Sequence, residues 1–208
     1  MNNPKKALIL VDIQNDFLPG GSLAVQHGDE VISIANAVQH GFDLIVATQD
    51  WHPANHGSFA SNHEGKKPGD VIELHGLQQV LWPDHCVQGT RGAEFHRDLD
   101  LDRVQRVFRK ATDPEIDSYS AFFDNGHLKS TGLGDFLKSE SVEEIYIAGL
   151  ATDYCVKFTA FDGLELGFRT YLIEDAVRGV NLSLNDSADA IEKMRAAGVV
   201  ITNSAAVR

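Results

Sequence analysis

One of the two cysteines of the chain lies where an apolar segment with strand character is followed by a predicted helix. The segment is EEIYIAGL (143–150), and Cys155 falls in the overlapping stretch GLATDYCV (149–156). In the first turn of a helix, unpaired backbone N–H groups and the helix dipole favour a thiolate, and the same groups can hold an oxyanion. Free cysteine is also a common core residue, so a packing role is the alternative. A nearby base would favour a nucleophile.

Two charged residues at the ends of other predicted strands supply such a base and its partner. Asp12 follows the apolar run ALILV (7–11), and a carboxylate at a buried strand end is costly unless it is paired. Lys110 ends VQRVFRK (104–110) and is the natural partner. Taken singly, Asp12 could accept bonds from loop amides and Lys110 could lie in solvent. Together, Asp12, Lys110 and Cys155 predict a base, an orienting cation and a nucleophile.

A second group of polar residues has the composition of a metal site. Asp50 and His52 lie at i and i+2 of a strand end, which puts their side chains on the same side. His85, in WPDHC, could complete a site of two imidazoles and one carboxylate with open positions for water or substrate. His56 is left as a further ligand, and Cys86 is expected in the core. The alternative is a polar surface loop, because five of the nine histidines cluster here.

Aromatic residues beside these segments could line a flat apolar pocket. The four residues are Phe17, Trp82, Tyr119 and Tyr154. Their alternative place is the hydrophobic core, where aromatic side chains are most often found.

The elements that must position these side chains alternate between strands and helices. Apolar runs rich in Val and Ile predict strands at 7–13, 43–50, 104–110, 143–150, 169–175 and 199–204. Helical spacing predicts helices at 30–40, 131–140, 152–167 and 183–198. Near-continuous apolar strands in this order are typical of a parallel sheet covered on both faces. The predicted fold is α/β: a three-layer α/β/α sandwich with a central, mostly parallel six-stranded sheet.

This topology gives the polar residues a common location. Ligands of open α/β sheets bind beyond the carboxyl ends of the strands, and four predicted strands deliver reactive side chains there. One domain over residues 1–208 is expected, with a loop insertion at about 51–103 that is too long and irregular for a compact repeat. A loop of that kind is usually functional or disordered, and its aromatic residues favour an ordered, packed one.

Composition limits the classes of partner and the compartment. The 208 residues are 43% hydrophobic and 23% charged, with a net charge of −12, which argues against nucleic acid and anionic membranes as partners. The apolar run Ala7–Val11 is too short for a secretory signal, and nothing in the sequence approaches the roughly 20 apolar residues of a membrane span. Two cysteines do not form a secreted framework, so we expect a cytoplasmic protein with reduced thiols.

Five motifs in order resemble one known family. VDIQNDF, DWHP-x-x-H-x-SFA, LWPDHCVQGT-x-G-A-x-FH, FRKA and GLATDYCV are similar to those of the nicotinamidase/pyrazinamidase branch of the isochorismatase-like cysteine hydrolases. The resemblance implies a metal-dependent amidase of the NAD salvage route, which converts nicotinamide to nicotinate and ammonia through a thioester and also accepts pyrazinamide. It allows any oligomeric state from monomer to higher oligomer.

The resemblance also implies roles for matching residues. Cys155 would be the nucleophile, Asp12 the proton acceptor and Lys110 the third member of a triad. The metal, usually zinc and sometimes iron or manganese, would bind Asp50, His52 and His85, whereas relatives differ over the position of His56. A cis peptide before Ala151 would aim its N–H, with that of Cys155, at the substrate carbonyl oxygen. The residues matched to the substrate pocket are Phe17 and Trp82, which would sandwich the pyridine ring, and Tyr119 beside them.

Two alternatives stay open on the sequence. Amidases of the same superfamily that act on carbamoyl or ureido substrates resemble this chain in the triad but lack the set of Asp50, His52 and His85. A metal-binding or redox-sensing module with Cys155 as the sensor would have no use for Lys110 beside Asp12, and it predicts metal binding without ammonia release. A nucleotide-binding module is disfavoured because the chain has no phosphate loop motif.

Overall fold

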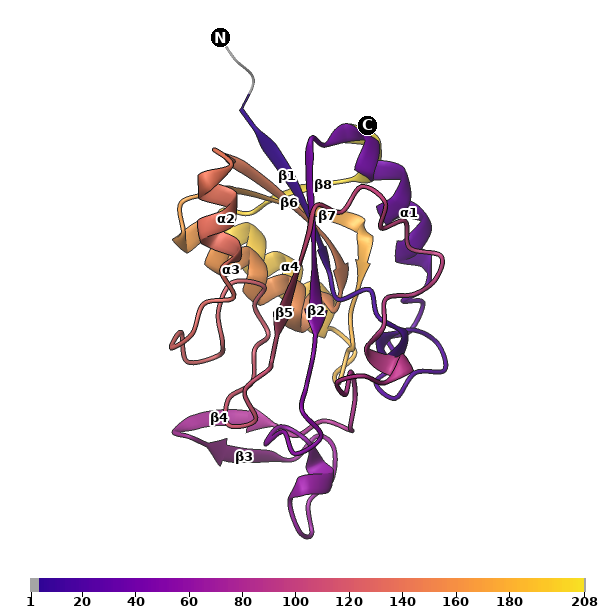
Figure 1. Ribbon diagram of the computed structural model, residues 1–208, viewed down its shortest axis with the longest axis vertical. Coiled ribbons are helices and arrows are strands. Elements are labelled where there is room, and N and C mark those ends of the chain that lie inside the picture. The colour runs from indigo at the N-terminus through magenta and orange to yellow at the C-terminus, as the bar shows by residue number, and fades with distance from the viewer. Residues whose placement is uncertain (1–3, 208) are drawn as a thin grey trace.

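A six-stranded parallel sheet forms the centre of the molecule (Figure 1). The computed structural model describes residues 4–207. The strands run in the order β5-β2-β1-β6-β7-β8, and every neighbouring pair is parallel. Their bounds are β1 Lys6–Val11, β2 Leu44–Asp50, β5 Arg106–Lys110, β6 Glu144–Leu150, β7 Arg169–Arg178 and β8 Val200–Thr202. The predicted central sheet is therefore confirmed, and it is parallel throughout.

Helices cover both faces of this sheet, which confirms the three-layer prediction. Helix α1 (Glu30–Val38) packs on one face, and α2 (Leu133–Ser139), α3 (Lys157–Glu165) and α4 (Asp186–Ala197) pack on the other (Figure 1). Strand β1 shows why: Leu8 and Leu10 belong to the core under α1, whereas Ala7, Ile9 and Val11 belong to the opposite core. Strands buried on both faces explain the near-continuous apolar runs in the sequence.

Element boundaries differ from the predicted ones by a few residues. The predicted strand 104–110 begins at Arg106, and the Gln105 side chain before it bonds the backbone of Asp43 and Ile45 at the start of β2. The predicted helix 152–167 is divided into a π-helical turn, Thr152–Val156, and α3. The predicted strand at 169–175 runs on to Arg178. The ends of helices and strands depend on local hydrogen bonds, which the apolar periodicity of the sequence does not show.

The predicted insertion at 51–103 is ordered and packs against the carboxyl edge of the sheet. It contains a small antiparallel hairpin of β3 (Val71–Leu74) and β4 (Leu77–Val80). Isolated bridges from His52 to Val87 and from Phe59 to Trp82 hold the irregular segments together. Phe59 is fully buried and Trp82 is 4% exposed. The hairpin and the segments joined by these bridges thus cover the strand ends, below the main sheet in Figure 1. The end of the insertion runs back along α1, where Asp98 accepts a hydrogen bond from Asn36.

Glycine is required where β1 and β6 lie closest to the site. Gly149 pairs with Val11 and has a φ of +122°. A Cβ at this position would lie 2.1 Å from the Val11 carbonyl oxygen. The missing side chain therefore lets β1 and β6 come close together just before the site residues Asp12 and Ala151.

Within residues 4–207, no helix combines the length and apolar character needed to span a bilayer.

Candidate active site and metal centre

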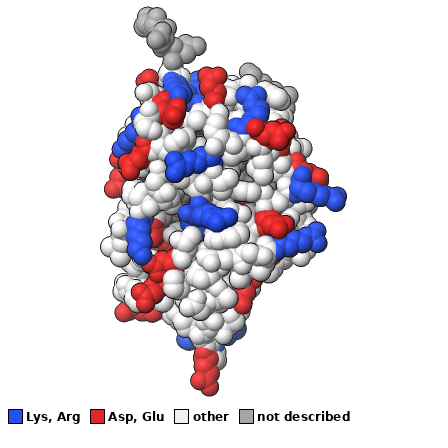
Figure 2. Space-filling model, in the orientation of Figure 1, with Lys and Arg blue, Asp and Glu red and all other residues white. Residues whose placement is uncertain are grey.

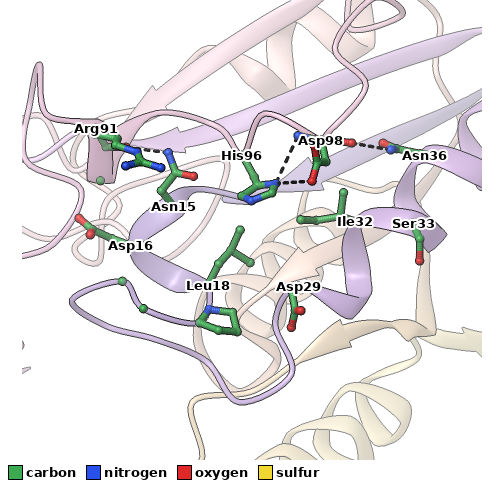
Figure 3. Close-up of a pocket in the computed structure, with 14 residues that line it drawn as sticks. Asn15, Asp16, Leu18, Asp29, Ile32, Ser33, Asn36, Arg91, His96 and Asp98 are labelled. Carbon is green, nitrogen blue, oxygen red and sulfur yellow. Dashed lines mark hydrogen bonds and ion pairs between the residues drawn. The ribbon is translucent and has the colours of Figure 1, made fainter.

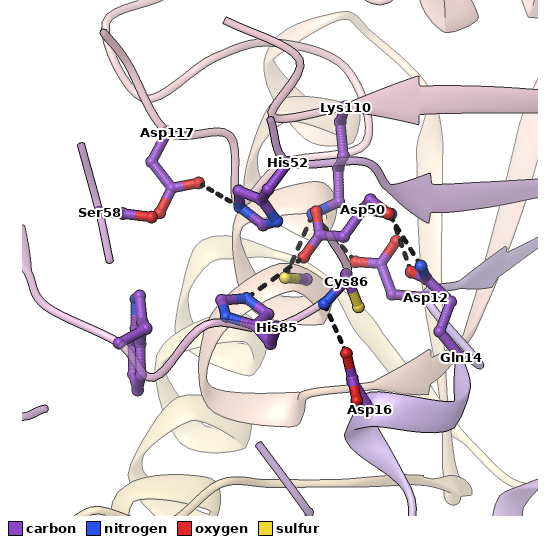
Figure 4. A network of polar contacts seen from close by, with 12 residues as sticks. Asp12, Gln14, Asp16, Asp50, His52, Ser58, His85, Cys86, Lys110 and Asp117 are labelled. Atoms are coloured by element: carbon purple, nitrogen blue, oxygen red, sulfur yellow. Dashed lines mark hydrogen bonds and ion pairs between the residues drawn. The ribbon is translucent and has the colours of Figure 1, made fainter. Parts of the chain in front are cut away.

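Lys110 lies at the centre of a buried polar cluster at the carboxyl edge of the sheet (Figure 4). Its Nζ is 3.0 Å from Oδ2 of Asp12, 3.4 Å from Sγ of Cys155 and 2.8 Å from the Ser118 carbonyl oxygen, and it also donates to Oδ1 of Asp50. Burial opposes the charged ammonium, but the Asp12 and Asp50 carboxylates outweigh it and raise the pKa of Lys110 well above its usual range. The cation is shared by two carboxylates.

The chain turns sharply after β1 so that the Asp12 side chain meets this cation. Asp12 has a φ of +49°, and a hydrogen bond of 2.8 Å from the Gln14 N–H to the Asp12 carbonyl closes the turn. Thr48 donates to Oδ1 of Asp12 at 2.7 Å. Oδ2 has only the ion pair with Lys110 and receives no hydrogen bond from the described residues. Burial, opposed by Lys110 and reinforced by Asp50, raises the pKa of Asp12 to about 6.

Cys155 is a buried thiol in the π-helical turn after β6. It is 6% exposed and forms no disulfide. Ligand atoms of Asp12, Asp50 and Cys155 lie within 4.8 Å of one another. Burial opposes the thiolate that the helix start was expected to favour. Burial raises the pKa of the thiol well above its usual range, Lys110 lowers it by less, and the Asp12 and Asp50 charges raise it further.

The peptide bond between Leu150 and Ala151 is cis, as the family resemblance implies. It joins the last residue of β6 to the start of the turn that carries Cys155. The Ala151 carbonyl accepts hydrogen bonds of 3.1 Å from the N–H groups of Tyr154 and Val156. The turn is therefore closed around the thiol.

Asp50, His52 and His85 meet beside Lys110 as predicted for a metal group. One ligand atom from each lies within 4.8 Å of the other two, and all three residues are buried. Nδ1 of His85 lies 2.8 Å from the Pro83 carbonyl and donates to it, so Nε2 is left as an acceptor 4.0 Å from Asp50 Oδ2. Burial, followed by the nearby His52, lowers the pKa of His85 to about 4. A neutral imidazole is the form that binds metal.

His52, like His85, has one ring nitrogen that is available to bind a cation. Its Nε2 lies 3.4 Å from Oδ1 of Asp117, and its Nδ1 is buried without a hydrogen-bond partner among the described residues. A carboxylate on one ring nitrogen and a free second nitrogen is the usual arrangement of a metal-binding histidine. These two imidazoles and one carboxylate therefore fit a divalent transition-metal ion.

His56 lies next to His52 but belongs to a second group. Its ligand atom clusters with those of His52 and Asp117 rather than with those of Asp50 and His85. Nδ1 of His56 contacts the Ser58 hydroxyl at 2.7 Å, and Nε2 is buried without a partner in the described chain. Its role as a ligand stays a prediction. Asp117 was not predicted, because it follows no strand and belongs to no recognisable spacing pattern.

Four aromatic side chains surround the thiol and the metal group in one small pocket. Phe17, Trp82, Tyr119 and Tyr154 line it together with Asp50, His85, Ala151 and Cys155. Trp82 packs edge-on against Tyr154 with ring centroids 4.8 Å apart, and its Nε1 donates to the Tyr119 hydroxyl at 3.1 Å. The predicted pocket residues thus meet around the sulfur. Cys86, by contrast, is fully buried in the core under α1, as expected.

A wider surface hollow lies beside α1 and contains none of the predicted catalytic or metal residues (Figure 3). It is lined by polar groups such as Asn15, Asn36, Arg91, His96 and Asp98. Several of these groups satisfy one another: Asn36 donates to the Asp98 carbonyl at 2.8 Å, and the Asp98 N–H donates to Nδ1 of His96 at 3.2 Å. The chemistry of the molecule is therefore concentrated in the smaller aromatic pocket.

Gln14 is a second residue that the sequence analysis missed. Its amide nitrogen donates to the Asp50 carbonyl, and its amide oxygen accepts from the Asp50 N–H, both at 2.8 Å. This paired contact fixes the end of β2 against the segment after β1. Gln14 stands inside the motif VDIQNDF, directly after the apolar residue Ile13, and its place in that motif was the available signal.

Comparison with known proteins identifies the family of the chain. A profile described as the isochorismatase domain matches residues 6–206. The chain belongs to the isochorismatase family. Nicotinamidase of Escherichia coli (strain K12) is 50% identical to this chain in an alignment of 202 residues, which covers 95% of this chain and 94% of that protein. The nicotinamidase/pyrazinamidase of Mycobacterium tuberculosis is 36% identical, covering 96% of this chain and 99% of its own.

Solved structures of the isochorismatase family have the same fold as this chain. A nicotinamidase of Acinetobacter baumanii superposes with a TM-score of 0.94 at 46% identity and covers 100% of both chains. A pyrazinamidase of Pyrococcus horikoshii, in complex with zinc, has a TM-score of 0.78 at 41% identity and covers 96% of this chain and 99% of its own. The resemblance found in the motifs is confirmed.

Proposed function

We propose that this protein is a nicotinamidase, a cysteine hydrolase that cleaves the carboxamide C–N bond of nicotinamide. The observation that carries the proposal is the contact of one buried ammonium, that of Lys110, with the Asp12 carboxylate and the Cys155 sulfur. Such a cluster supplies a base and a nucleophile under an aromatic pocket. The nicotinamidase relatives support nicotinamide as substrate, and the relatives named for both activities support pyrazinamide as a second one.

The first half of the reaction makes a thioester and releases ammonia. The Asp12 carboxylate, which lies close to the thiol, accepts the Cys155 proton, and the sulfur adds to the carboxamide carbon. Lys110 stabilises both the thiolate and the carboxylate. The N–H groups of Ala151 and Cys155 bind the oxyanion, and such a donor typically contributes about 3 kcal/mol to transition-state stabilisation. Asp12 then returns the proton to the leaving nitrogen, and the C–N bond breaks.

The second half hydrolyses the thioester. Asp12 accepts a proton from a water molecule, the hydroxide adds to the thioester carbon, and the C–S bond breaks. The proton returns from Asp12 to the Cys155 sulfur, and the nicotinic acid loses its carboxyl proton to solvent and leaves as nicotinate. The raised pKa of Asp12, about 6, suits a group that must both accept and return a proton near neutral pH.

We propose that Asp50, His52 and His85 hold one divalent ion and that this ion is zinc, as in the Pyrococcus horikoshii complex. When bound, the ion would act as a Lewis acid toward the pyridine nitrogen and so orient the ring. Phe17 and Trp82 would sandwich that ring, and Tyr119 would complete the wall.

The proposal extends to cellular context. A net charge of −12 supports a protein with small-molecule partners rather than nucleic acid or an anionic membrane. Figure 2 shows basic and acidic side chains interspersed over the visible face, which has no continuous basic field. We also propose one domain over 1–208, a cytoplasmic location and a place in NAD salvage. The family resemblance allows a homo-oligomer as well as a monomer.

Ammonia release from nicotinamide tests the proposed function. Three samples are compared: native protein, chelated protein with and without added zinc, and Cys155→Ala. Activity that needs both the metal and the thiol is expected. Substantial turnover by Cys155→Ala would contradict the mechanism. No release by the native protein would turn attention to carbamoyl and ureido substrates, and failure on those would favour the sensor alternative.

A further inference from the structure

The small hairpin of β3 and β4 has one buried side chain, and it is polar. Of the eight strand residues, only Gln79 is buried, with 3% of its surface exposed, whereas its neighbour Gln78 faces solvent. Burying an amide is costly unless it forms hydrogen bonds. The Gln79 amide nitrogen lies 2.7 Å from the Val80 carbonyl, 3.1 Å from Oδ2 of Asp117 and 3.2 Å from the Tyr119 hydroxyl.

The contact with Asp117 reaches the metal group. Asp117 is 3% exposed, and its other oxygen, Oδ1, accepts a hydrogen bond from the Ser118 N–H at 2.8 Å and lies 3.4 Å from Nε2 of His52. The rotation of the Asp117 carboxylate decides whether Oδ1 faces His52. Gln79 constrains that rotation because it donates to the opposite oxygen.

The contact with Tyr119 reaches the aromatic pocket. The Tyr119 hydroxyl also accepts from Nε1 of Trp82 at 3.1 Å, and both rings line the pocket around Cys155. The hydroxyl is therefore held between an amide from the hairpin and an indole from the pocket wall. Burial, reinforced by the Asp117 charge, raises the pKa of Tyr119 well above its usual range, so the hydroxyl is neutral.

We propose that Gln79 is a positioning residue that ties the orientation of His52 in the metal group to the aromatic wall of the substrate pocket. The inference rests on the proposed function. One amide group, brought in by an otherwise exposed hairpin, contacts both an oxygen of the carboxylate that orients a metal ligand and the hydroxyl that holds Trp82. The role of the hairpin in the insertion would then be to carry Gln79 to these two groups.

Gln79→Met tests the proposal, with Gln78→Met as the matched control on the same strand. Methionine keeps the volume of glutamine but has no N–H donor. Zinc affinity is measured in competition with a fluorescent chelator, and KM for nicotinamide is measured at saturating zinc. Gln79→Met is expected to weaken zinc binding about tenfold, the lower end for losing an outer partner of a metal ligand. KM is expected to rise roughly 2- to 12-fold, the equivalent of one hydrogen bond, with kcat unchanged.

Circular dichroism and Tm control for folding, and Gln78→Met is expected to behave as the native protein in all assays. If Gln79→Met does not fold, Gln79→Glu, which keeps the shape but replaces the donating nitrogen by oxygen, takes its place. Unchanged zinc affinity, or weaker zinc binding with an unchanged KM, would overturn the proposal. A native protein inactive on nicotinamide would refute the proposed function instead, and the zinc measurement would then decide the role of Gln79 by itself.

Discussion

Nζ of Lys110 lies 3.0 Å from Oδ2 of Asp12, and both side chains are fully buried. The same nitrogen also donates to Asp50, the carboxylate of the metal group. One cation therefore joins the proposed catalytic group to the proposed metal group. A buried pair of this kind is costly to break, because removal of one member leaves the other charged and unpaired.

Replacement of Lys110 by methionine should strongly destabilise the metal-free protein. Two buried carboxylates would lose their shared cation, and such a loss typically lowers the free energy of unfolding by about 3–5 kcal/mol. Urea denaturation in the presence of a chelator measures this change. The control is Lys129→Met, which removes a surface lysine that is 68% exposed and paired with Asp113. That change should cost less than about 1 kcal/mol. Similar losses for the two variants would contradict the central position of Lys110.

The pH profile of kcat/KM should have an acid limb near pH 6. The pKa of Asp12 is raised to about 6 mainly by burial. Only the carboxylate can accept the thiol proton, so activity is present above this pKa and is lost as pH falls through it. Thr48→Val should move the limb to higher pH, because the lost hydroxyl stabilises the carboxylate at 2.7 Å.

Thr170→Val is a suitable control for this shift. Thr170 is also buried, but its hydroxyl bonds to the Phe168 carbonyl, far from Asp12 in the sheet. Its acid limb should coincide with that of the native protein. A limb that stays in place in Thr48→Val would show that another group limits the reaction at low pH.

His85→Ala should remove the metal without removing the triad. The expected loss of metal affinity exceeds the roughly 10- to 100-fold that outer-shell partners contribute, because a ligand itself is deleted. Metal content after gel filtration and ammonia release measure the effect. His75→Ala is the control, since the His75 side chain is 53% exposed on the hairpin. Full metal content in His85→Ala would exclude the predicted ligand set.

Phe17→Leu should weaken substrate binding and leave the chemistry intact. Leucine remains apolar but cannot stack on a pyridine ring, and aromatic pairs contribute about 0.5–1.5 kcal/mol beyond their buried area. KM for nicotinamide should therefore rise roughly 2- to 12-fold at an unchanged kcat. Phe42→Leu, which alters a buried ring packed against Tyr146 in the core, should lower Tm without changing KM. An unchanged KM in Phe17→Leu would remove Phe17 from the pocket wall.

The sequence by itself determined which segments form strands, that these strands are buried on both faces, and at which edge of the sheet the polar residues meet. Apolar runs such as ALILV report burial on both faces, and parallel strands must place Asp12, Asp50 and Lys110 at a common edge. Strand periodicity placed Asp50 and His52 on one side of a strand end, and the family resemblance added His85 to them. These features depend on local pattern, which a single chain displays directly.

Only the tertiary structure decided how those residues share their contacts. Lys110 serves Asp50 as well as Asp12, and Asp117 and Gln79 reach the site from segments that end no strand of the main sheet. The raised pKa of the Cys155 thiol likewise follows from burial beside two carboxylates rather than from its place in a helical turn. Such contacts join residues far apart in the chain: Asp12 and Thr48 are 36 positions apart, and Asp50 and Lys110 are 60 positions apart. Their geometry is set by packing of whole elements, and local periodicity carries no record of it.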